Sequence, residues 1–458
     1  ITLNMESIAK TYLDLFDENR QAIEKGSFPL MNNAREGARE DYSAHGLPSL
    51  RSENYNRTDI HDLFSLDYGV NINGVQFPLH DTKGFSCDVE DMPYMQGIIL
   101  NERFDRELSQ GLEQLPTGVY IGSLRAFLTE HPEREPQFAK IYGRYAETDI
   151  GGIVALNTMF AQDAVLLFVP KGVKVTEPLR LIQLVRADVP MLLFRRVLIV
   201  LEEESAIEVL VCNHTLDKHD FLVDQVIEVH VAENAQLKLY DVEESSSRMR
   251  HLSTLCLRQY ESSKVLINGL TLNNGITRNS YWTRFMGPHA ELTLAGLAIG
   301  TQAQHVDNFT YISHIFPECK THELFKYIMD DEAVGAFAGR IFVSAQAQKT
   351  DAQQSNRNLL LSPNARVYSK PQLEIYADDV KCSHGMTTGQ LDEEALFYMQ
   401  QRGVSKDEAR TLLSIAFTDD VVRLIELEPL RASIVDVISS RFNNQEIRHC
   451  NKCGKVCF

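Results

Sequence analysis

Short apolar strands separated by small polar turns dominate the middle of the chain. From about residue 151, segments rich in Val, Ile and Leu follow one turn after another, and no strong helical period separates most of them. Many short strands with repeated turn signals are typical of a sandwich, a barrel or a β-solenoid. Five segments open 26 to 33 residues apart and a sixth opens later, which favours a solenoid of stacked rungs; the openings are Pro170, Glu203, Ala232, Glu261, Gly287 and Ser362. A single rung cannot bury its apolar face, so stacking would supply the core.

The first 65 residues carry a helical period instead. Ile8, Tyr12 and Phe16 recur with the spacing of one helix face, and Gly26 is placed to end that helix. A second helix is expected to break at Gly46. The sequence therefore predicts a helical unit ahead of the strands.

The region between these parts is mixed. Two short helices are expected over 102–115 and 122–133, between loops. The whole pattern predicts a mainly β protein with four parts: a mostly helical N-terminal domain (1–150), a β-solenoid (151–385), a helical C-terminal domain (386–442) and a Cys-rich tail (443–458).

The C-terminal helices carry clear start and stop signals. Asp392 is placed to cap a helix that ends at Gly403. Ser405 and Glu408 form a capping box at the start of the next helix. That helix is expected to present one apolar face, made by Ala409, Leu412, Leu413, Ala416 and Phe417.

A last helix is expected near 430–438, with Ile434, Val437 and Ile438 on its apolar face. Two uses of these C-terminal helices are open. They pack on each other and on the end of the solenoid, or they form a docking surface for a partner.

Charge and composition restrict the class of protein. The 458 residues include 45 basic and 63 acidic side chains, a net charge of −18, which argues against nucleic acid or an anionic membrane as a partner. No apolar run approaches the roughly 20 residues that a bilayer needs. We also expect no secretory signal at the N-terminus, because the first residues lack a basic region followed by an apolar stretch.

Cysteine usage points to a reducing compartment. Five of the eight cysteines are scattered singly, namely Cys87, Cys212, Cys256, Cys319 and Cys382. A long chain with this spacing is not a disulfide scaffold. We therefore expect free thiols and a cytoplasmic protein.

The sequence lacks the common catalytic signatures. It contains no G-x-x-x-x-G-K-[ST], G-x-G-x-x-G, H-E-x-x-H or G-x-S-x-G motif. The chain is not expected to hydrolyse ATP through a P-loop. The absence of these motifs favours a non-enzymatic protein.

Cys382 and His384 are the first candidate site. A strand is expected to end at Lys381, and residues at i and i+2 of a strand point to the same side, so the thiol and the imidazole would share one space. Both groups are good ligands for iron and zinc, but two side chains are too few for a closed site. The alternative is structural: a small buried cysteine and a hydrogen-bonded histidine at the end of a strand.

The tail is the second candidate site. His449, Cys450, Cys453 and Cys457 combine a C-x-x-C with a further cysteine and a neighbouring histidine. This pattern fits a metal or redox site, although a structural zinc site needs two complete pairs. The alternative is a thiol-bearing appendage without a bound metal.

Other polar features have structural explanations. His305 and His314 are nine residues apart, so an unbroken strand would place them on opposite faces. The Gln- and Asn-rich segment 339–365 fits a ladder of amides along solenoid rungs. Trp282, the only tryptophan, is expected in the core.

At this point a family resemblance becomes visible. The segment KPQLEIYADDVKCSHGMTTGQLDEEALFYMQQRG, from Lys370 to Gly403, resembles the SufD family of the SUF iron–sulfur cluster assembly machinery. GLPSLRSENYNRTDI resembles the N-terminal G-L-P…E…T signature, with Tyr55 where tryptophan is common. Further likenesses lie in ALNTMFAQDAVLLFVPKGVKVTEPLRL and HVDNFTYISH. The paralogous SufB family typically has H-E-A-T where this chain has the residues from His384 to Thr387.

The resemblance implies a fold and partners. It implies a right-handed parallel β-helix core flanked by helical N-terminal and C-terminal domains. It also implies a SufBCD complex, in which the β-helix pairs with SufB and the C-terminal helices, about 392–442, dock the ATPase SufC. The chain would be a non-catalytic scaffold subunit, and ATP hydrolysis would belong to SufC.

The resemblance also implies a site. His384 matches the family's cluster-site histidine near the SufB interface, and Cys382 matches a nearby cysteine. A cysteine of SufB would complete the site for a transient iron–sulfur cluster. Reduced flavin binding to the complex is a weaker implication. The resemblance does not extend to Cys450, Cys453 and Cys457.

Three alternatives stay open at this level. One is a SufB-like paralogue scaffold. Another is a β-helix carbohydrate-active enzyme, which would need a groove of clustered catalytic residues. The third is a stand-alone metal-binding or redox protein acting through residues 443–458.

Overall fold

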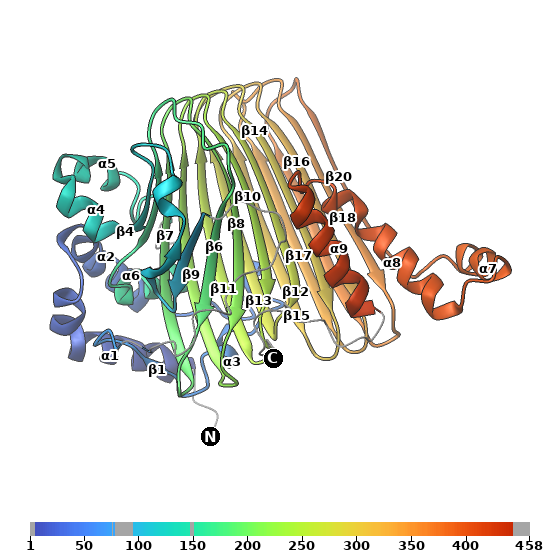
Figure 1. Ribbon diagram of the computed structural model, residues 1–458, viewed down its shortest axis with the longest axis horizontal. Helices are drawn as coiled ribbons and strands as arrows, with labels where there is room; N and C mark the ends of the chain where they lie inside the picture. The colour runs from blue at the N-terminus through green and yellow to red at the C-terminus, as the bar shows by residue number, and fades with distance from the viewer. Residues whose placement is uncertain (1–4, 76, 78–94, 147–150, 443–458) are drawn as a thin grey trace.

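The centre of the protein is a β-solenoid of two parallel sheets (Figure 1). The computed structural model describes residues 5–75, 77, 95–146 and 151–442. We call the sheets A and B. Sheet A contains β4 (Tyr120–Ser123), β5 (Val165–Val169), β7 (Met191–Leu201), β9 (Phe221–Val231), β11 (Met249–Gln259), β13 (Ile276–Phe285), β15 (His305–His314), β17 (Val334–Val343) and β19 (Arg366–Ile375), with β1 (Gly69–Val70) beside β7. Sheet B contains β3 (Arg103–Gln110), β2 (Gln96–Leu100), β6 (Leu179–Val185), β8 (Ala206–Thr215), β10 (Gln236–Glu244), β12 (Lys264–Asn273), β14 (Glu291–Gly300), β16 (Lys320–Met329), β18 (Asp351–Leu360) and β20 (Lys381–Gly389).

Successive rungs place one strand in each sheet, and equivalent residues stack. In sheet B, Lys264 pairs with Glu291, Glu291 pairs with Lys320, and Lys320 pairs with Asp351. Because side chains alternate along a strand, each strand sends one set inward and the other outward. Inward positions of neighbouring strands therefore form columns, and the two sheets enclose the main hydrophobic core. The predicted solenoid is confirmed.

Stacked turns join the rungs where the sequence predicted them. Glu204, Asn234 and Ser262 adopt φ values of 60°, 57° and 55°, a left-handed conformation that costs a non-glycine residue about 1–2 kcal/mol. The amide of Glu204 donates to the carbonyl of Glu233 at 2.9 Å, and that of Asn234 to Glu261 at 3.0 Å. Each turn is thus hydrogen-bonded to the next, and these bonds offset the free-energy cost of the left-handed backbone conformation.

The N-terminal helices cover the outer face of sheet A. Phe160 stacks on Phe194 of β7 with ring centroids 4.9 Å apart, and Phe16 packs against Phe160. The first two helices end at Lys25 and His45, as Gly26 and Gly46 predicted. The helices are α1 (Met5–Lys25), α2 (Pro29–His45), α3 (Ile60–Leu63), α4 (Leu124–Glu130), α5 (Glu135–Phe138) and α6 (Gly152–Phe160), with the 3₁₀ turns η1 (Glu53–Tyr55), η2 (Leu112–Gln114) and η3 (Pro132–Arg134).

The C-terminal helices lie on the other side of the solenoid. Helices α8 (Lys406–Val422) and α9 (Glu428–Phe442) pack on the outer face of sheet B, and α7 (Glu393–Gln401) projects beyond it (Figure 1). Asp392 and Ser405 cap α7 and α8 by accepting backbone N–H bonds, which confirms both predicted caps. Among the described residues, no helix combines the length and apolarity that a bilayer crossing requires.

One predicted helix is wrong. Residues 102–115 were expected to be helical, but 103–110 form β3 and only 112–114 form a 3₁₀ turn. Asn101, with φ of 57°, reverses the chain so that β3 pairs antiparallel with β2. Pairing with an existing strand overrides the local helical preference. The helix expected over 122–133 is present as α4, 124–130.

The predicted apolar face of α8 is only partly right. Ala409 is buried as expected, but Leu412 and Ala416 are exposed, and Thr411, Ser414 and Thr418 are buried instead. The helix therefore presents its smaller side chains to the solenoid, where they allow close packing. In α9, the expected Ile434 and Ile438 are buried, with Val437 partly buried beside them.

The last strand departs from expectation at its start. The sequence suggested a strand ending at Lys381, whereas β20 begins at Lys381 and runs to Gly389. The solenoid therefore continues past residue 385. Cys382 and His384 lie inside a strand rather than at a junction.

Candidate functional site

The solenoid has an open end formed by β19 and β20. Each is the last strand of its sheet, with a hydrogen-bonded partner on one side only. Most residues of β20 are exposed, including Met386 at 46%. Tyr368 and Ile375 of β19 and the following Tyr376 are exposed too. A long unpaired edge with exposed apolar side chains is a template for pairing with another chain.

Cys382 and His384 lie on β20, at this open end. Their strand spacing places both side chains on the inward side, about 6.6 Å apart along the strand. Cys382 is half-buried and packs against the hydrophobic interior, while His384 is exposed. In β18, Ala352 pairs with Cys382 and Gln354 pairs with His384. The structure thus brings the two predicted residues to one side of the open end.

The Cys382 thiol must lose its proton before it can bind a metal. Burial raises the pKa of the Cys382 thiol, so the neutral thiol predominates at neutral pH. A bound metal would deprotonate it, because a coordinating thiol loses its proton to the metal's charge. No group of three or more His, Cys, Asp or Glu side chains is arranged to hold a metal ion within the described part of the chain. Any metal at Cys382 and His384 needs further ligands from another source.

A column of polar groups lies behind His384. Glu323 of β16 and Gln354 of β18 occupy the same inward position one and two strands away from the edge. Gln354 Nε2 donates to Glu323 at 2.7 Å, and Thr310 Oγ1 of sheet A donates to the other carboxylate oxygen at 2.6 Å. Sequence reasoning did not identify Glu323. The only signal was the Gln- and Asn-rich segment that contains Gln354.

That segment forms amide hydrogen bonds inside the solenoid. Asn356 donates to the carbonyl of Phe325 at 3.2 Å, and Asn358 donates to Asn356 and to Thr388 of β20. The bonds to Phe325 and Thr388 link neighbouring strands, while the bond between Asn358 and Asn356 lies within β18. The register of β18 pairs neither Asn356 nor Asn358 with an amide side chain on the next strand, so the predicted ladder is found only in part.

The two histidines of β15 point to opposite faces, as predicted. His314 points inward against the ring of Phe285, and burial lowers its pKa to about 3. His305 points outward, where Thr58 lies 3.0 Å away, and burial also lowers its pKa. Both are neutral at physiological pH, and they do not meet.

Trp282 was expected in the core. It is half-buried on the outer face of sheet A and contacts the rings of Phe309 and Tyr311.

The N-terminal signature segment crosses the outer face of sheet A. Arg278 pairs with Asp307 at 2.6 Å, with both side chains almost fully buried. Thr58 donates to Asp307 at 2.6 Å, Arg278 donates to the carbonyl of Asn54, and its guanidinium lies over the ring of Tyr55. The segment therefore fastens the N-terminal domain to later rungs. The contacts of this segment give it a structural role.

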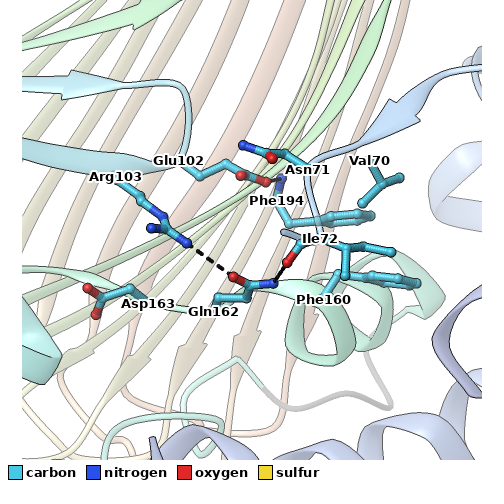
Figure 2. A pocket seen from close by; sticks show the side chains of 9 residues that line it. All are labelled: Val70, Asn71, Ile72, Glu102, Arg103, Phe160, Gln162, Asp163 and Phe194. Carbon is cyan, nitrogen blue, oxygen red and sulfur yellow. Dashed lines mark hydrogen bonds between the residues drawn. The ribbon is translucent and has the colours of Figure 1, made fainter. Parts of the chain in front are cut away.

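A small pocket lies at the opposite end of the solenoid (Figure 2). Arg103 donates to Gln162 at 3.1 Å, and Gln162 donates to the carbonyl of Ile72. Burial raises the pKa of Glu102 to about 7, and this side chain accepts from the amide of Phe194. The cavity volume is about 10 Å³, room for about one water molecule. It is too small for an organic substrate.

The C-terminal helices combine a buried anchor with an exposed apolar surface. Lys326 of β16 is buried and donates to Asp420 and to the carbonyl of Phe417, both on α8. Phe397 and Tyr398 of α7 and Leu412 of α8 are exposed. This arrangement fixes α8 to the sheet and leaves apolar area uncovered.

The tail cysteines Cys450, Cys453 and Cys457, with His449, lie outside the described residues. Their use as a metal site stays a prediction.

Comparison with known families covers nearly the whole chain. Residues 184–417 match the model of the SufBD core domain of SUF-system FeS cluster assembly, and residues 6–181 match the SufBD protein N-terminal region. The core match alone spans more than half of the chain.

Curated relatives agree with these matches. The chain is 28% identical over 422 residues to an iron–sulfur cluster assembly SufBD family protein of Synechocystis, covering 90% of this chain and 91% of the relative. It is 27% identical over 403 residues to the iron–sulfur cluster assembly protein SufD of Escherichia coli, covering 86% of this chain and 89% of the relative. It is 27% identical over 338 residues to SufD of Bacillus subtilis, covering 73% of this chain and 76% of the relative.

Proposed function

The chain belongs to the SufBD family of iron–sulfur cluster assembly proteins, and from this premise we propose that it is the SufD-like, non-catalytic scaffold subunit of a SufBCD-type complex. The observation that carries the proposal is the open solenoid end, where two free strand edges and the pair Cys382 and His384 occur together. Edges of this length call for a partner strand. A SufB-type solenoid is the partner we propose.

The ligand count supports a shared site. Cys382 and His384 offer one sulfur and one nitrogen, and a tetrahedral iron needs four ligands in all. A thiolate from the SufB-type subunit and inorganic sulfide would supply the rest. In this proposal the nascent cluster is cargo, held briefly between two subunits and then passed to an acceptor.

A SufC-type ATPase is proposed to dock on the C-terminal helices. Support comes from the exposed apolar side chains of Phe397 and Leu412, which nothing covers within the described residues. ATP binding and hydrolysis belong to that partner. Motion of the docked helices would pass through the anchor of Lys326 on Asp420 into sheet B, and from there to the open end.

Other parts of the assignment remain predictions of this proposal. They are a cytoplasmic location, reduced flavin binding by the complex, and the boundaries of the four domains. Family membership removes the carbohydrate-active alternative. A SufB-like role is disfavoured because named relatives include SufD of two bacteria and because Gly385 follows His384 where SufB-type chains typically have glutamate.

Anaerobic co-expression with the cognate SufB- and SufC-type subunits tests the proposal. Wild type, Cys382→Ala and His384→Ala would be compared by size exclusion, cluster absorbance and iron content. His322→Ala is the matched control, because His322 is an exposed histidine of the same sheet that faces outward. We expect His384→Ala to keep the complex and lose most of the cluster. Normal cluster content in His384→Ala would refute its ligand role.

A further inference from the structure

One inward column of sheet B changes character toward the open end. Its earlier members, Leu239, Ile267 and Leu294, are buried and apolar. Its later members are Glu323, Gln354 and His384. An amide or a carboxyl buried in an apolar interior costs several kcal/mol unless it is hydrogen-bonded. The substitution of polar for apolar groups at three successive rungs, ending at the candidate ligand, calls for an explanation.

Glu323 fixes the orientation of the Gln354 amide. The carboxyl group is fully buried and accepts from Thr310 on one oxygen and from Gln354 Nε2 on the other. With its nitrogen turned to Glu323, Gln354 keeps its carbonyl oxygen, Oε1, for another donor. Oε1 is buried and has no hydrogen-bond partner in the structure. A buried acceptor without a donor is rare in folded proteins.

Sheet A leaves room for this amide. Gly339 of β17 faces Gln354 across the interior, and a Cβ on Gly339 would lie 2.3 Å from Gln354 Nε2 and 2.8 Å from the ring of Phe337. A side chain at 339 would thus displace the amide. The glycine is needed for close approach, since its φ is not in the left-handed region.

The next strand places His384 beside Gln354. His384 is the register partner of Gln354, and neighbouring strands lie about 4.8 Å apart. The imidazole is exposed in the structure, so a hydrogen bond to the free oxygen requires a rotation of the ring toward the interior.

We propose that Thr310, Glu323 and Gln354 form a positioning relay for His384. Gln354 Oε1 accepts the N–H of one imidazole nitrogen and so fixes the tautomer, and the other nitrogen presents its lone pair at the open end. This inference rests on the proposed ligand role of His384 and deepens it. Metal-binding histidines commonly donate their second N–H to such a partner, and loss of the partner lowers metal affinity roughly 10- to 100-fold.

The test uses the full chain without partners. Protein with ¹⁵N-labelled histidine would be studied by NMR, and the ring signals of His384 assigned by their loss in His384→Ala. In wild type we expect one neutral tautomer, with distinct shifts for the two ring nitrogens. In Gln354→Leu the acceptor is gone, and we expect the shifts to move toward the average of two tautomers. Glu323→Gln should move them in the same direction.

Asn356→Leu is the matched control. Asn356 is an equally buried amide on the same strand, but its register partner is Met386. We expect this variant to keep the wild-type His384 signals. Identical His384 signals in wild type and Gln354→Leu would overturn the relay, as would an equal change in Asn356→Leu.

Cluster content in the complex separates the two proposals. If His384→Ala loses the cluster while Gln354→Leu keeps both the cluster and the tautomer, the ligand role stands and the relay fails. If the tautomer depends on Gln354 but His384→Ala keeps its cluster, the hydrogen bond exists and the ligand role fails, so the relay has no function in assembly.

Discussion

The ammonium of Lys326 lies 2.6 Å from a carboxylate oxygen of Asp420, and this contact joins strand β16 to helix α8. Lys326 is 4% exposed while Asp420 is 54% exposed, so the lysine is the buried partner. The same nitrogen donates to the carbonyl of Phe417 at 2.7 Å. The Lys326 side chain thus bonds to one backbone carbonyl and to one carboxylate of α8.

Replacement of this lysine should loosen α8 and α9 selectively. Lys326→Met keeps the length of the side chain and removes two charge-assisted hydrogen bonds, each worth about 1.5–3 kcal/mol. We expect faster amide hydrogen exchange over residues 406–442 and unchanged exchange in α1 and α2. Lys320→Met, which removes only exposed ion-pair contacts, is the control. Unchanged exchange in α8 would show that the apolar packing alone holds the helix.

The exposed face of α8 should determine ATPase binding. Leu412 is 45% exposed, and Leu412→Asp puts a charge where we propose that a partner covers apolar surface. We expect the affinity for the SufC-type subunit to fall about tenfold or more, as at an interface hot spot, with the melting temperature unchanged. Val189→Asp, a charge at an exposed valine distant from α8, should bind normally. Titration calorimetry measures both, and equal affinities would place the ATPase elsewhere.

The fastening of the N-terminal segment depends on Asp307. Asp307→Ala leaves Arg278 buried without its carboxylate, and the loss of one partner of a buried pair typically costs about 3–5 kcal/mol. Urea denaturation should show a loss of this size. Glu53→Gln, which weakens an exposed ion pair of the same segment with Lys370, should cost less than about 1 kcal/mol. Equal losses in the two variants would contradict this assignment.

Glu323 should make stability fall as the pH rises. Burial raises its pKa from 4.5 to about 7 in the folded protein, so the unfolded chain loses this proton first. The neutral form favours folding below the unfolded pKa, and its contribution is lost as the pH rises to about 7. The free energy of unfolding of wild type relative to Glu323→Gln should therefore decrease by about 2–3 kcal/mol from pH 5 to pH 8. A pH-independent difference would contradict the burial effect.

The tail cysteines should be dispensable for assembly at the open end. A chain truncated after residue 442 keeps Cys382, His384 and all three C-terminal helices. Co-expressed with its partners, it should hold as much cluster as the full chain. Loss of the cluster on truncation, with the complex intact, would move the ligand role to Cys450, Cys453 and Cys457.

Local signals predicted most of the architecture. The capping side chains of Asp392 and Ser405, the breaks at Gly26 and Gly46, and the repeated turns are short-range features, and the structure has them where the sequence placed them. Errors arose where a distant contact decides the outcome. Residues 103–110 are a strand because β2 lies beside them, a fact that no local pattern contains.

The candidate site was predictable only in part. The spacing of Cys382 and His384 indicated a shared side, which the register of β20 bears out. The residues behind His384 were not found, because Thr310, Glu323 and Gln354 are brought together by two sheets and two successive rungs. The pairing of Arg278 with Asp307 was missed for the same reason, since the two are 29 residues apart in sequence but adjacent in sheet A.

The two ends of the solenoid differ in a way that limits its stoichiometry. At the N-terminal end each sheet finishes in an antiparallel strand, β3 or β4, and β3 carries charged side chains such as Arg103 and Asp105 that oppose further pairing. Among the described residues, β19 and β20 at the C-terminal end are the terminal parallel strands with a free edge. If two chains pair through these edges, as we propose for the SufB-type partner, neither leaves a free edge there for a third, and the assembly would close at a pair.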